Sequence, residues 1–136
     1  MKLHLLLVLL IALSYSVFSQ NPPNVERSGG QIVEITNLTG KVAGMKCIDP
    51  SLLKGTVTKK WFEKDDLTIA GFTLNNAKNK ETSILLNNEQ VKLLGQYSAD
   101  TMSSLIKNGK RLQVWVYECT NENSEIVIYL NRIKPL

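Results

Sequence analysis

The sequence predicts a mainly β domain with one short helix, on three observations. Five segments between residues 52 and 133 have strand-like composition, and in the fourth of them apolar and polar residues alternate, as they do in strands that bury one face. Between the third and the fourth segment, apolar residues recur at helical spacing instead. Turn-forming residues separate the segments, and the chain of 136 residues suits one domain with one core.

Five strands are expected, each bounded by a local turn signal. In the first strand, Gly55 allows the chain to bend. The charged run at 63–66 and the polar run at 75–80 predict the first two turns, and residues 120–124 predict the last one. The expected strands are residues 52–63, 67–74, 81–87, 110–119 and 125–133.

The helix is expected to begin at Ser98, after an ambiguous stretch at 88–97 for which a single helical turn is expected. Ser98 suits the N-cap, and Asp100 is favourable in the first turn of a helix. Gly109 suits the C-terminal end. The apolar stripe predicts core packing rather than a cofactor site; it consists of Ala99, Met102, Leu105 and Ile106.

This element order resembles that of the OB-fold, a five-stranded Greek-key barrel with a helix between its third and fourth strands. We therefore expect residues 31–136 to form a single domain with the barrel at 52–133. Residues 31–47 are expected to form an N-terminal β extension that turns at Thr39-Gly40. The alternative is a small open β-sandwich that uses these N-terminal strands and packs the helix on one edge.

Residues 1–19 are expected to be a signal peptide. Lys2 precedes an apolar run from Leu3 to Leu13, and small residues precede a cleavage site ahead of Gln20. The run, about 11 residues long, is too short to cross a bilayer, so no transmembrane segment is predicted. The chain is therefore expected to be exported, to the periplasm or beyond, with residues 20–30 as a flexible leader.

The charge of the chain gives little support for a nucleic-acid partner. The formal net charge is +4, and it falls to +3 when Lys2 leaves with the signal peptide. Nucleic-acid binding usually requires a clustered basic stripe, whereas the small lysine groups here, such as Lys59, Lys60 and Lys64, are expected to be solvated surface. Single-stranded nucleic-acid binding remains the weaker alternative.

The residue types present argue against catalysis. The single histidine, His4, lies in the signal peptide, and Cys47 and Cys119 of an exported protein are expected to form a disulfide. The carboxylates Asp65 and Asp66 are adjacent on a turn and do not converge across a cleft. Neither a calcium-loop spacing nor a phosphate loop occurs. A non-catalytic protein without cofactor or metal is therefore predicted.

Aromatic residues on the predicted strands have two interpretations. Trp61 and Trp115 are candidates for a platform that stacks a ligand, as aromatics do on OB-fold faces. In 110–119, however, Trp115, Tyr117 and Cys119 share one face. If Cys119 bonds Cys47, residues 31–47 lie beside that face. We expect those residues to cover at least half of Trp115 and Tyr117 and to make a second buried layer.

The cysteine positions and two turns resemble those of a known family. Cys47 lies just before the first strand and Cys119 at the end of the fourth, the acidic turn carries Asp65 and Asp66, and Asn121 lies two residues past the second cysteine. Over residues 47–133 the chain is similar to the B subunits of Shiga-type AB5 toxins. Two features of that family have no counterpart here: its glycine-and-aromatic loop after the second cysteine and its tryptophan before the helix.

The resemblance implies the OB-fold and the disulfide more than it implies the glycan binding and oligomer formation of that family. We accordingly predict an exported non-catalytic binding module for a glycan or an envelope or extracellular protein, with candidate ligand residues Asp65, Asp66, Asn121, Trp61 and Trp115. The alternative is a structural or homo-oligomeric interaction protein of the bacterial envelope with no small ligand. Asn37-Leu38-Thr39 is a glycosylation sequon, relevant only to a eukaryotic secretory pathway.

Overall fold

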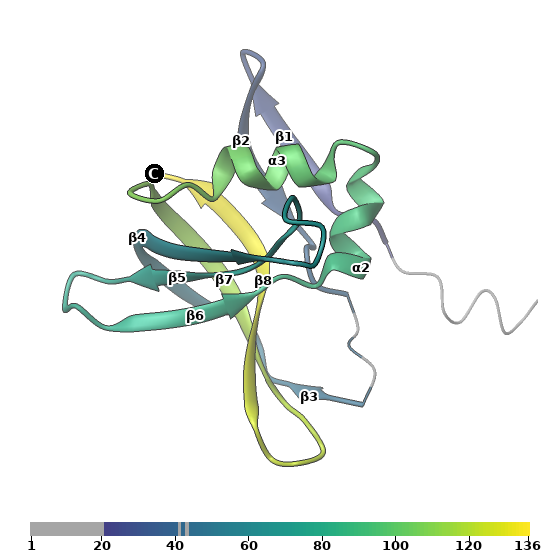
Figure 1. The fold of residues 1–136 in the computed structure, drawn as a ribbon, viewed down its shortest axis with the longest axis vertical. Helices are drawn as coiled ribbons and strands as arrows, with labels where there is room; N and C mark the ends of the chain where they lie inside the picture. The colour runs from purple at the N-terminus through teal and green to yellow at the C-terminus, as the bar shows by residue number, and fades with distance from the viewer. Residues whose placement is uncertain (1–20, 41, 43) are drawn as a thin grey trace, which may run out of the picture.

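The computed structural model describes residues 21–136 with the exception of residues 41 and 43, so the predicted signal peptide lies outside the described residues. The described chain is mainly β, with eight strands in one sheet, two short α-helices and one 3-10 turn (Figure 1). The strands are β1 (Asn24–Ser28), β2 (Gln31–Thr36), β3 (Lys46–Cys47), β4 (Ser51–Phe62), β5 (Ile69–Asn75), β6 (Glu81–Leu85), β7 (Arg111–Thr120) and β8 (Ile126–Pro135). The helical elements are α2 (Asn88–Val91), η1 (Lys92–Leu94) and α3 (Ser98–Leu105).

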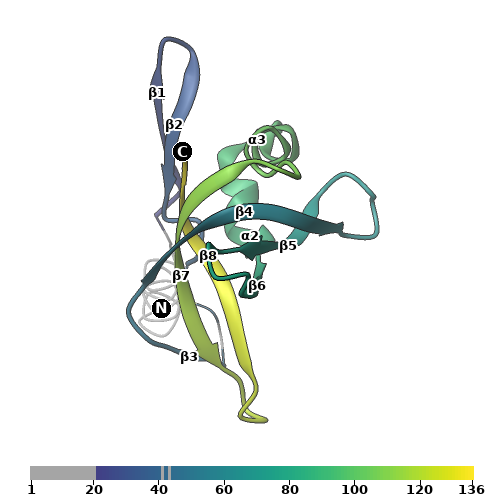
Figure 2. The ribbon, with the colours of Figure 1, turned by 90° about the vertical axis from the view of Figure 1, so that its left-hand side faces the viewer.

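Five of the strands pair in a closed circuit. Strand β4 pairs with β5, and β5 with β6, all antiparallel. Strand β6 meets β8 in parallel at one residue pair, Leu85 opposite Tyr129. Strand β8 then pairs with β7, and β7 returns to β4. The five strands therefore wrap around one interior, as the two ribbon views show (Figures 1 and 2).

The strands and the main helix predicted between residues 52 and 133 are confirmed, with ends shifted by a few residues. The helical region is larger than predicted, because α2 and η1 form in the stretch that was expected to hold a single turn. The predicted capping role of Ser98 is wrong: Ser98 is the first residue of α3, and Tyr97 at the N-cap makes no side-chain hydrogen bond to the helix.

The N-terminal segment differs from the prediction. Residues 20–30 were expected to be a flexible leader, but β1 forms within them and pairs with β2 as a hairpin. The hairpin turns at Gly29 and Gly30, whose φ angles of 58° and 81° lie in the region that glycine tolerates best. Thr39 and Gly40 lie between β2 and β3, which do not pair with each other: β2 pairs with β1 and β8, and β3 is a separate two-residue strand beside β7.

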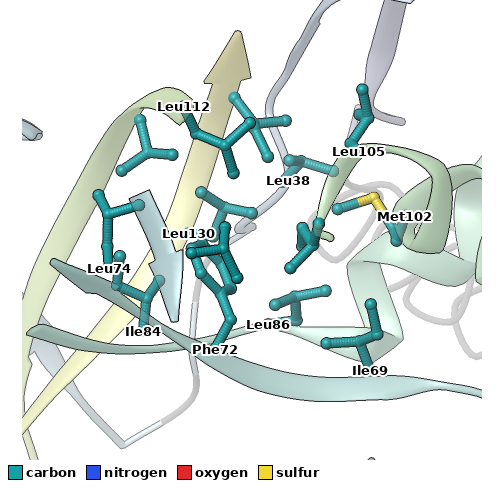
Figure 3. Packing of buried hydrophobic residues seen from close by; sticks show 14 of the residues in the cluster. Leu38, Ile69, Phe72, Leu74, Ile84, Leu86, Met102, Leu105, Leu112 and Leu130 are labelled. Carbon is teal, nitrogen blue, oxygen red and sulfur yellow. The ribbon is translucent and has the colours of Figure 1, made fainter. Parts of the chain in front are cut away.

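The hydrophobic core lies inside the circuit and extends to α3 (Figure 3). Strands β5, β7 and β8 contribute about half of its buried side chains, and Met102 and Leu105 of α3 cover one end. Ile35 and Leu38 of the N-terminal segment are also fully buried, so this segment is part of the same core. The fully or nearly fully buried apolar residues of the sheet are Val57, Ile69, Phe72, Leu74, Ile84, Leu112, Val114, Val116, Leu130 and Ile133.

Strand β4 is shared by two partners and needs a glycine where it changes between them. Up to Thr56 it pairs with β7, and from Thr56 onward it pairs with β5. A Cβ atom on Gly55 would lie 2.4 Å from the carbonyl oxygen of Asn75. Only glycine fits this approach of two backbones, which agrees with the predicted bend.

Candidate functional site

The predicted disulfide is confirmed and joins β3 to β7. Cys47 and Cys119, 72 residues apart in sequence, are bonded and lie directly opposite each other in the antiparallel β3–β7 pair. No free cysteine is found among the described residues. The bond therefore fixes the segment that leads into β4 against the outer face of the circuit, the face that points away from the core.

Asp65 builds the β4–β5 turn with its own side chain. Its carboxylate accepts hydrogen bonds from the N–H groups of Leu67 and Thr68, at 2.9 and 2.8 Å, and from the hydroxyl of Thr68 at 2.6 Å. These donors, with the Thr68 hydroxyl first, lower the pKa of Asp65 from 3.8 to about 2. Asp66 follows with a left-handed φ of 58°. The acidic pair thus forms the turn.

Asn121 does the same for the β7–β8 turn. Its side-chain oxygen accepts hydrogen bonds from the N–H groups of Asn123 and Glu125, at 3.0 and 2.9 Å. Its backbone N–H also donates to the carbonyl of Glu125, at 3.1 Å. The side-chain oxygen of Asn121, which was expected to contact a ligand, is therefore engaged in hydrogen bonds within the turn.

The two turns lie far from each other in the fold. In Figure 2 the β4–β5 turn projects to one side, while the β7–β8 hairpin ends at the bottom of the view. Asp65 and Asp66 are thus not brought together with Asn121. Trp61 lies opposite Gly71 of β5 and its ring packs against that glycine, where an added Cβ would lie 2.4 Å from the ring.

Trp115 is half-buried and carries a stacked arginine. The guanidinium carbon of Arg132 lies 3.9 Å from the centroid of the Trp115 ring, and Arg132 Nε donates to the carboxylate of Glu34. Trp115 and Arg132 are cross-strand partners on β7 and β8, next to a register shift. The ring face is thus occupied by Arg132. Arg132 lies outside residues 31–47, the segment expected to cover Trp115.

Sequence reasoning missed Arg132 because its partner depends on register. A bulge between Trp115 and Val116 shifts the pairing of β7 with β8 by one residue. Without that shift, Arg132 would not lie opposite Trp115. The alternation of residues 110–119 indicates which side chains lie on the outer face. It does not indicate which residues of the neighbouring strand lie opposite them.

Tyr117 lines a pocket beside the disulfide, which the prediction of a second buried layer did not include. The pocket has a volume of about 420 Å³ and is bordered by residues of the N-terminal segment and by Cys47. Tyr117 is half-buried there. The other lining residues are Asn21, Asn37, Thr39, Gly40, Val42 and Met45.

A second concavity, which we call the open-end groove, was not predicted. It lies between the early parts of β6 and β8, on the N-terminal side of their single residue pair, and has a volume of about 580 Å³. Leu53, Val116 and Ile128 line it together with exposed Ile126. Its remaining lining residues are Ser51, Lys80, Glu81, Thr82, Ser83, Leu85, Glu118 and Val127.

The sequon at Asn37 is engaged in the fold. The Asn37 side-chain amide donates to the backbone oxygens of Asn21 and Pro22, at 2.7 and 3.3 Å, and Leu38 and Thr39 are buried. Buried Gln90 also donates to the carbonyls of Asn21 and Asn37, at 2.7 and 3.1 Å. Modification of Asn37 would therefore break the contacts that hold the start of the described chain.

The small lysine groups have a structural use at the end of α3. Lys60 Nζ donates to the carbonyl of Ile106 at 3.3 Å, and Lys110 Nζ donates to the carbonyl of Ser104 at 3.5 Å. Cations stabilise the negative end of a helix dipole, so these two lysines act as C-terminal caps.

Two features are not found among the described residues. In residues 21–136, apart from 41 and 43, no three cysteine, histidine or acidic side chains gather as a metal site would require. In the same part of the chain, no helix has both the length and the apolar composition that crossing a bilayer demands.

Comparison of the chain with protein-family models, with curated proteins and with solved structures finds no match.

Proposed function

We propose that the chain is an exported, non-catalytic binding module of OB-fold type, whose ligand is a glycan or an envelope or extracellular protein. The observation that carries the proposal is the closed circuit β4–β5–β6–β8–β7, which has its parallel pair between β6 and β8 and its helices between β6 and β7. This strand order is the one expected of a Greek-key barrel with the OB arrangement.

The position of the disulfide supports the same proposal. The β4–β5 and β7–β8 turns, however, favour a ligand site elsewhere in the domain. The Cys47–Cys119 bond ties the segment before β4 to the end of β7, which supports the disulfide-bonded OB arrangement proposed here. The side chains of Asp65 and Asn121 are engaged by their own turns, so they do not favour a glycan site of the toxin type. The open-end groove is the better candidate, because it combines volume with apolar lining.

The geometry of the groove suits a ligand that inserts between strands. Strands β6 and β8 pair at one position and diverge along the groove. Exposed Ile126, with 69 % of its surface accessible, stands at the rim. Backbone groups along diverging strands offer hydrogen bonds to an extended ligand, and alternate side chains offer specificity.

The test is a glycan array together with a pull-down from an envelope fraction, each hit being rebound in purified form. We expect at least one purified ligand, whose binding falls about tenfold or more in Ser83→Arg and Ile126→Asp. The matched control Leu93→Asp changes an equally apolar exposed residue outside the groove and is expected to keep full binding. Empty screens, or equal binding by all three variants, would contradict the proposal.

The alternative, an oligomeric interaction protein, is favoured by one observation. Strand β1 is the edge of the sheet, most of its residues are exposed, and within the described chain it pairs with β2 alone. Exposed edges are templates for pairing with another chain. Light scattering of the oxidised protein would then give a mass above that of the monomer, and Glu26→Pro would return it to the monomer. A monomer at all concentrations would exclude this alternative.

A further inference from the structure

The outer face of β4, β7 and β8 carries a row of long polar side chains in register. Lys54 lies opposite Gln113, and Gln113 lies opposite Lys134. Both lysines are exposed and Gln113 is half-buried, whereas their neighbours Leu112, Val114 and Ile133 point into the core. Neighbouring strands are about 4.8 Å apart, so the two lysine Cα atoms flank the Gln113 amide across about 10 Å.

The strands of this face are poor in acidic residues. Together β4, β7 and β8 carry the basic residues Lys54, Lys59, Lys60, Arg111, Arg132 and Lys134. Their single acidic residue is Glu118, which lines the open-end groove rather than the row. On the adjoining hairpin, Glu34 is engaged by Arg132, with Glu26 opposite it on β1. Arg132 is thus paired, whereas neither Lys54 nor Lys134 forms an ion pair within the described residues, so the row of Lys54, Gln113 and Lys134 keeps its positive charge.

Arg132 is held in place at one end of this face. Its guanidinium stacks on Trp115 and its Nε is bonded to Glu34, so two contacts fix the plane of the group. Its side chain is 39 % exposed, and no hydrogen bond from its terminal nitrogens is found among the described residues. A guanidinium that is fixed in this way presents a planar fork suited to a carboxylate or a sulfate.

We propose that this outer face binds an acidic polysaccharide, one that carries carboxylate or sulfate groups. Arg132 and the lysines Lys54 and Lys134 receive the anionic groups, and the Gln113 amide meets hydroxyl or ring oxygens between them. The site goes beyond the proposed function, because it is separate from the open-end groove. None of these residues lines that groove, so substituting them changes no groove residue. We call these four residues the basic row.

The chemistry of the basic row favours a polysaccharide over other polyanions. Single-stranded nucleic acid binds by stacking bases on open aromatic faces, and the Trp115 ring is already covered by Arg132. A docked protein requires an apolar centre in its interface, whereas Lys54, Gln113 and Lys134 are polar along the whole row. A hydroxyl-rich chain with spaced negative charges fits both the charge and the hydrogen-bonding groups.

The test is binding of the purified, disulfide-bonded protein to polygalacturonate and to dextran sulfate, with neutral dextran as reference, at about 0.15 M salt. We expect both acidic polysaccharides to bind and dextran not to bind. The double variant Lys54→Glu/Lys134→Glu is expected to weaken binding at least about tenfold. The matched control Lys78→Glu/Lys92→Glu changes the net charge equally at exposed positions outside the row, and is expected to weaken binding less than about threefold.

Two further variants keep the proposal testable if the double reversal disturbs folding. Lys134→Gln removes one charge at an exposed position, and Arg132→Lys keeps the charge but loses the planar fork; each is expected to weaken binding about threefold or more. Equal weakening by the control pair would overturn the proposal, as would equal binding of neutral dextran or no binding of either acidic polysaccharide. Tighter binding of polyglutamate or of single-stranded DNA would also overturn it.

Discussion

The inner and outer faces of strand β7 differ in what covers them. On the inner face, Leu112 and Val114 are fully buried by side chains from several strands and from the N-terminal segment. On the outer face, Arg111 is exposed, and half-buried Trp115 is covered by the stacked Arg132. The inner face is therefore stabilised by close packing, whereas part of the outer face stays accessible to solvent and holds the basic row for which we propose ligand binding.

The comparison implies that substitutions on the two faces have different consequences. Inner-face changes are expected to reduce the free energy of unfolding, and outer-face changes are expected to alter binding while leaving stability nearly constant. Two places on the outer face are exceptions: Cys119, which is fully buried and bonded to Cys47, and Gly71, against which the Trp61 ring packs.

The largest expected effect is that of the disulfide. Replacing Cys47 and Cys119 together by alanine should lower the free energy of unfolding by about 4 kcal/mol, because a closed loop of this length restricts the unfolded chain. Denaturant unfolding of the oxidised protein and of the double variant measures the difference. A loss below about 1 kcal/mol would show that β3 is held by its strand pairing alone.

The next effect separates the two faces directly. Leu112→Ala should cost about 3 kcal/mol, because it removes a fully buried side chain and leaves a cavity. Arg111→Ala, one residue away on the exposed face, should change stability by less than about 0.5 kcal/mol. Equal losses in urea unfolding would contradict the difference between the faces.

A smaller loss of stability is expected at Gly71, where the Trp61 ring packs against the outer face of β5. Gly71→Ala should cost about 2 kcal/mol, because its Cβ would lie 2.4 Å from the Trp61 ring and 2.8 Å from the carbonyl oxygen of Ile84. Trp61→Leu in the same background should recover part of this loss. Thermal unfolding of the single and double variants measures the coupling, and strict additivity would rule out the contact.

The stack on Trp115 should contribute less again. A double-mutant cycle with Trp115→Leu and Arg132→Gln should give a coupling energy of about 1 kcal/mol, the range of a partly exposed cation–π contact. Arg132→Lys serves as the charge-preserving control. A coupling energy near zero would mean that the ring does not fix the guanidinium.

The smallest effect concerns the acidic turn. Because the folded-state pKa of Asp65 is depressed to about 2, its contribution to stability is fully present above the unfolded value of 3.8 and is lost as the pH falls through about 2. Thr68→Val removes the largest cause and should raise the pKa toward 3.8. Carbon NMR of the Asp65 carboxyl during an acid titration measures both values, and an unchanged pKa in the variant would refute the assigned cause.

The elements between residues 52 and 133 were predictable because each has a strong local signal. Alternation along residues 110–119 and 125–133 and the helical stripe around Met102 reflect burial against the core, which the structure confirms. Strand β1 has no such signal, because most of its residues are exposed and it is held by pairing with β2. The hairpin turn at Gly29-Gly30 was the available clue.

The candidate site was less predictable, because it depends on contacts across strands. Asp65 and Asn121 were chosen as candidate ligand residues because of the toxin resemblance. An Asp or Asn whose side chain can accept a hydrogen bond from the N–H group two residues later is, however, itself a turn signal. The basic row requires the pairings of Lys54 and Lys134 with Gln113, which the sequence of one strand does not contain. Register, set by the bulge beside Trp115, is the missing information.

An NMR titration of the oxidised, isotope-labelled protein with a sulfated oligosaccharide tests the difference between the faces most directly. The account predicts amide shift changes confined to residues 52–56, 111–115 and 132–134, with saturation and with weaker binding at higher salt. Shift changes centred on the open-end groove would place the oligosaccharide at the site of the proposed function and contradict the basic row, and no shift change at any oligosaccharide concentration would contradict it as well.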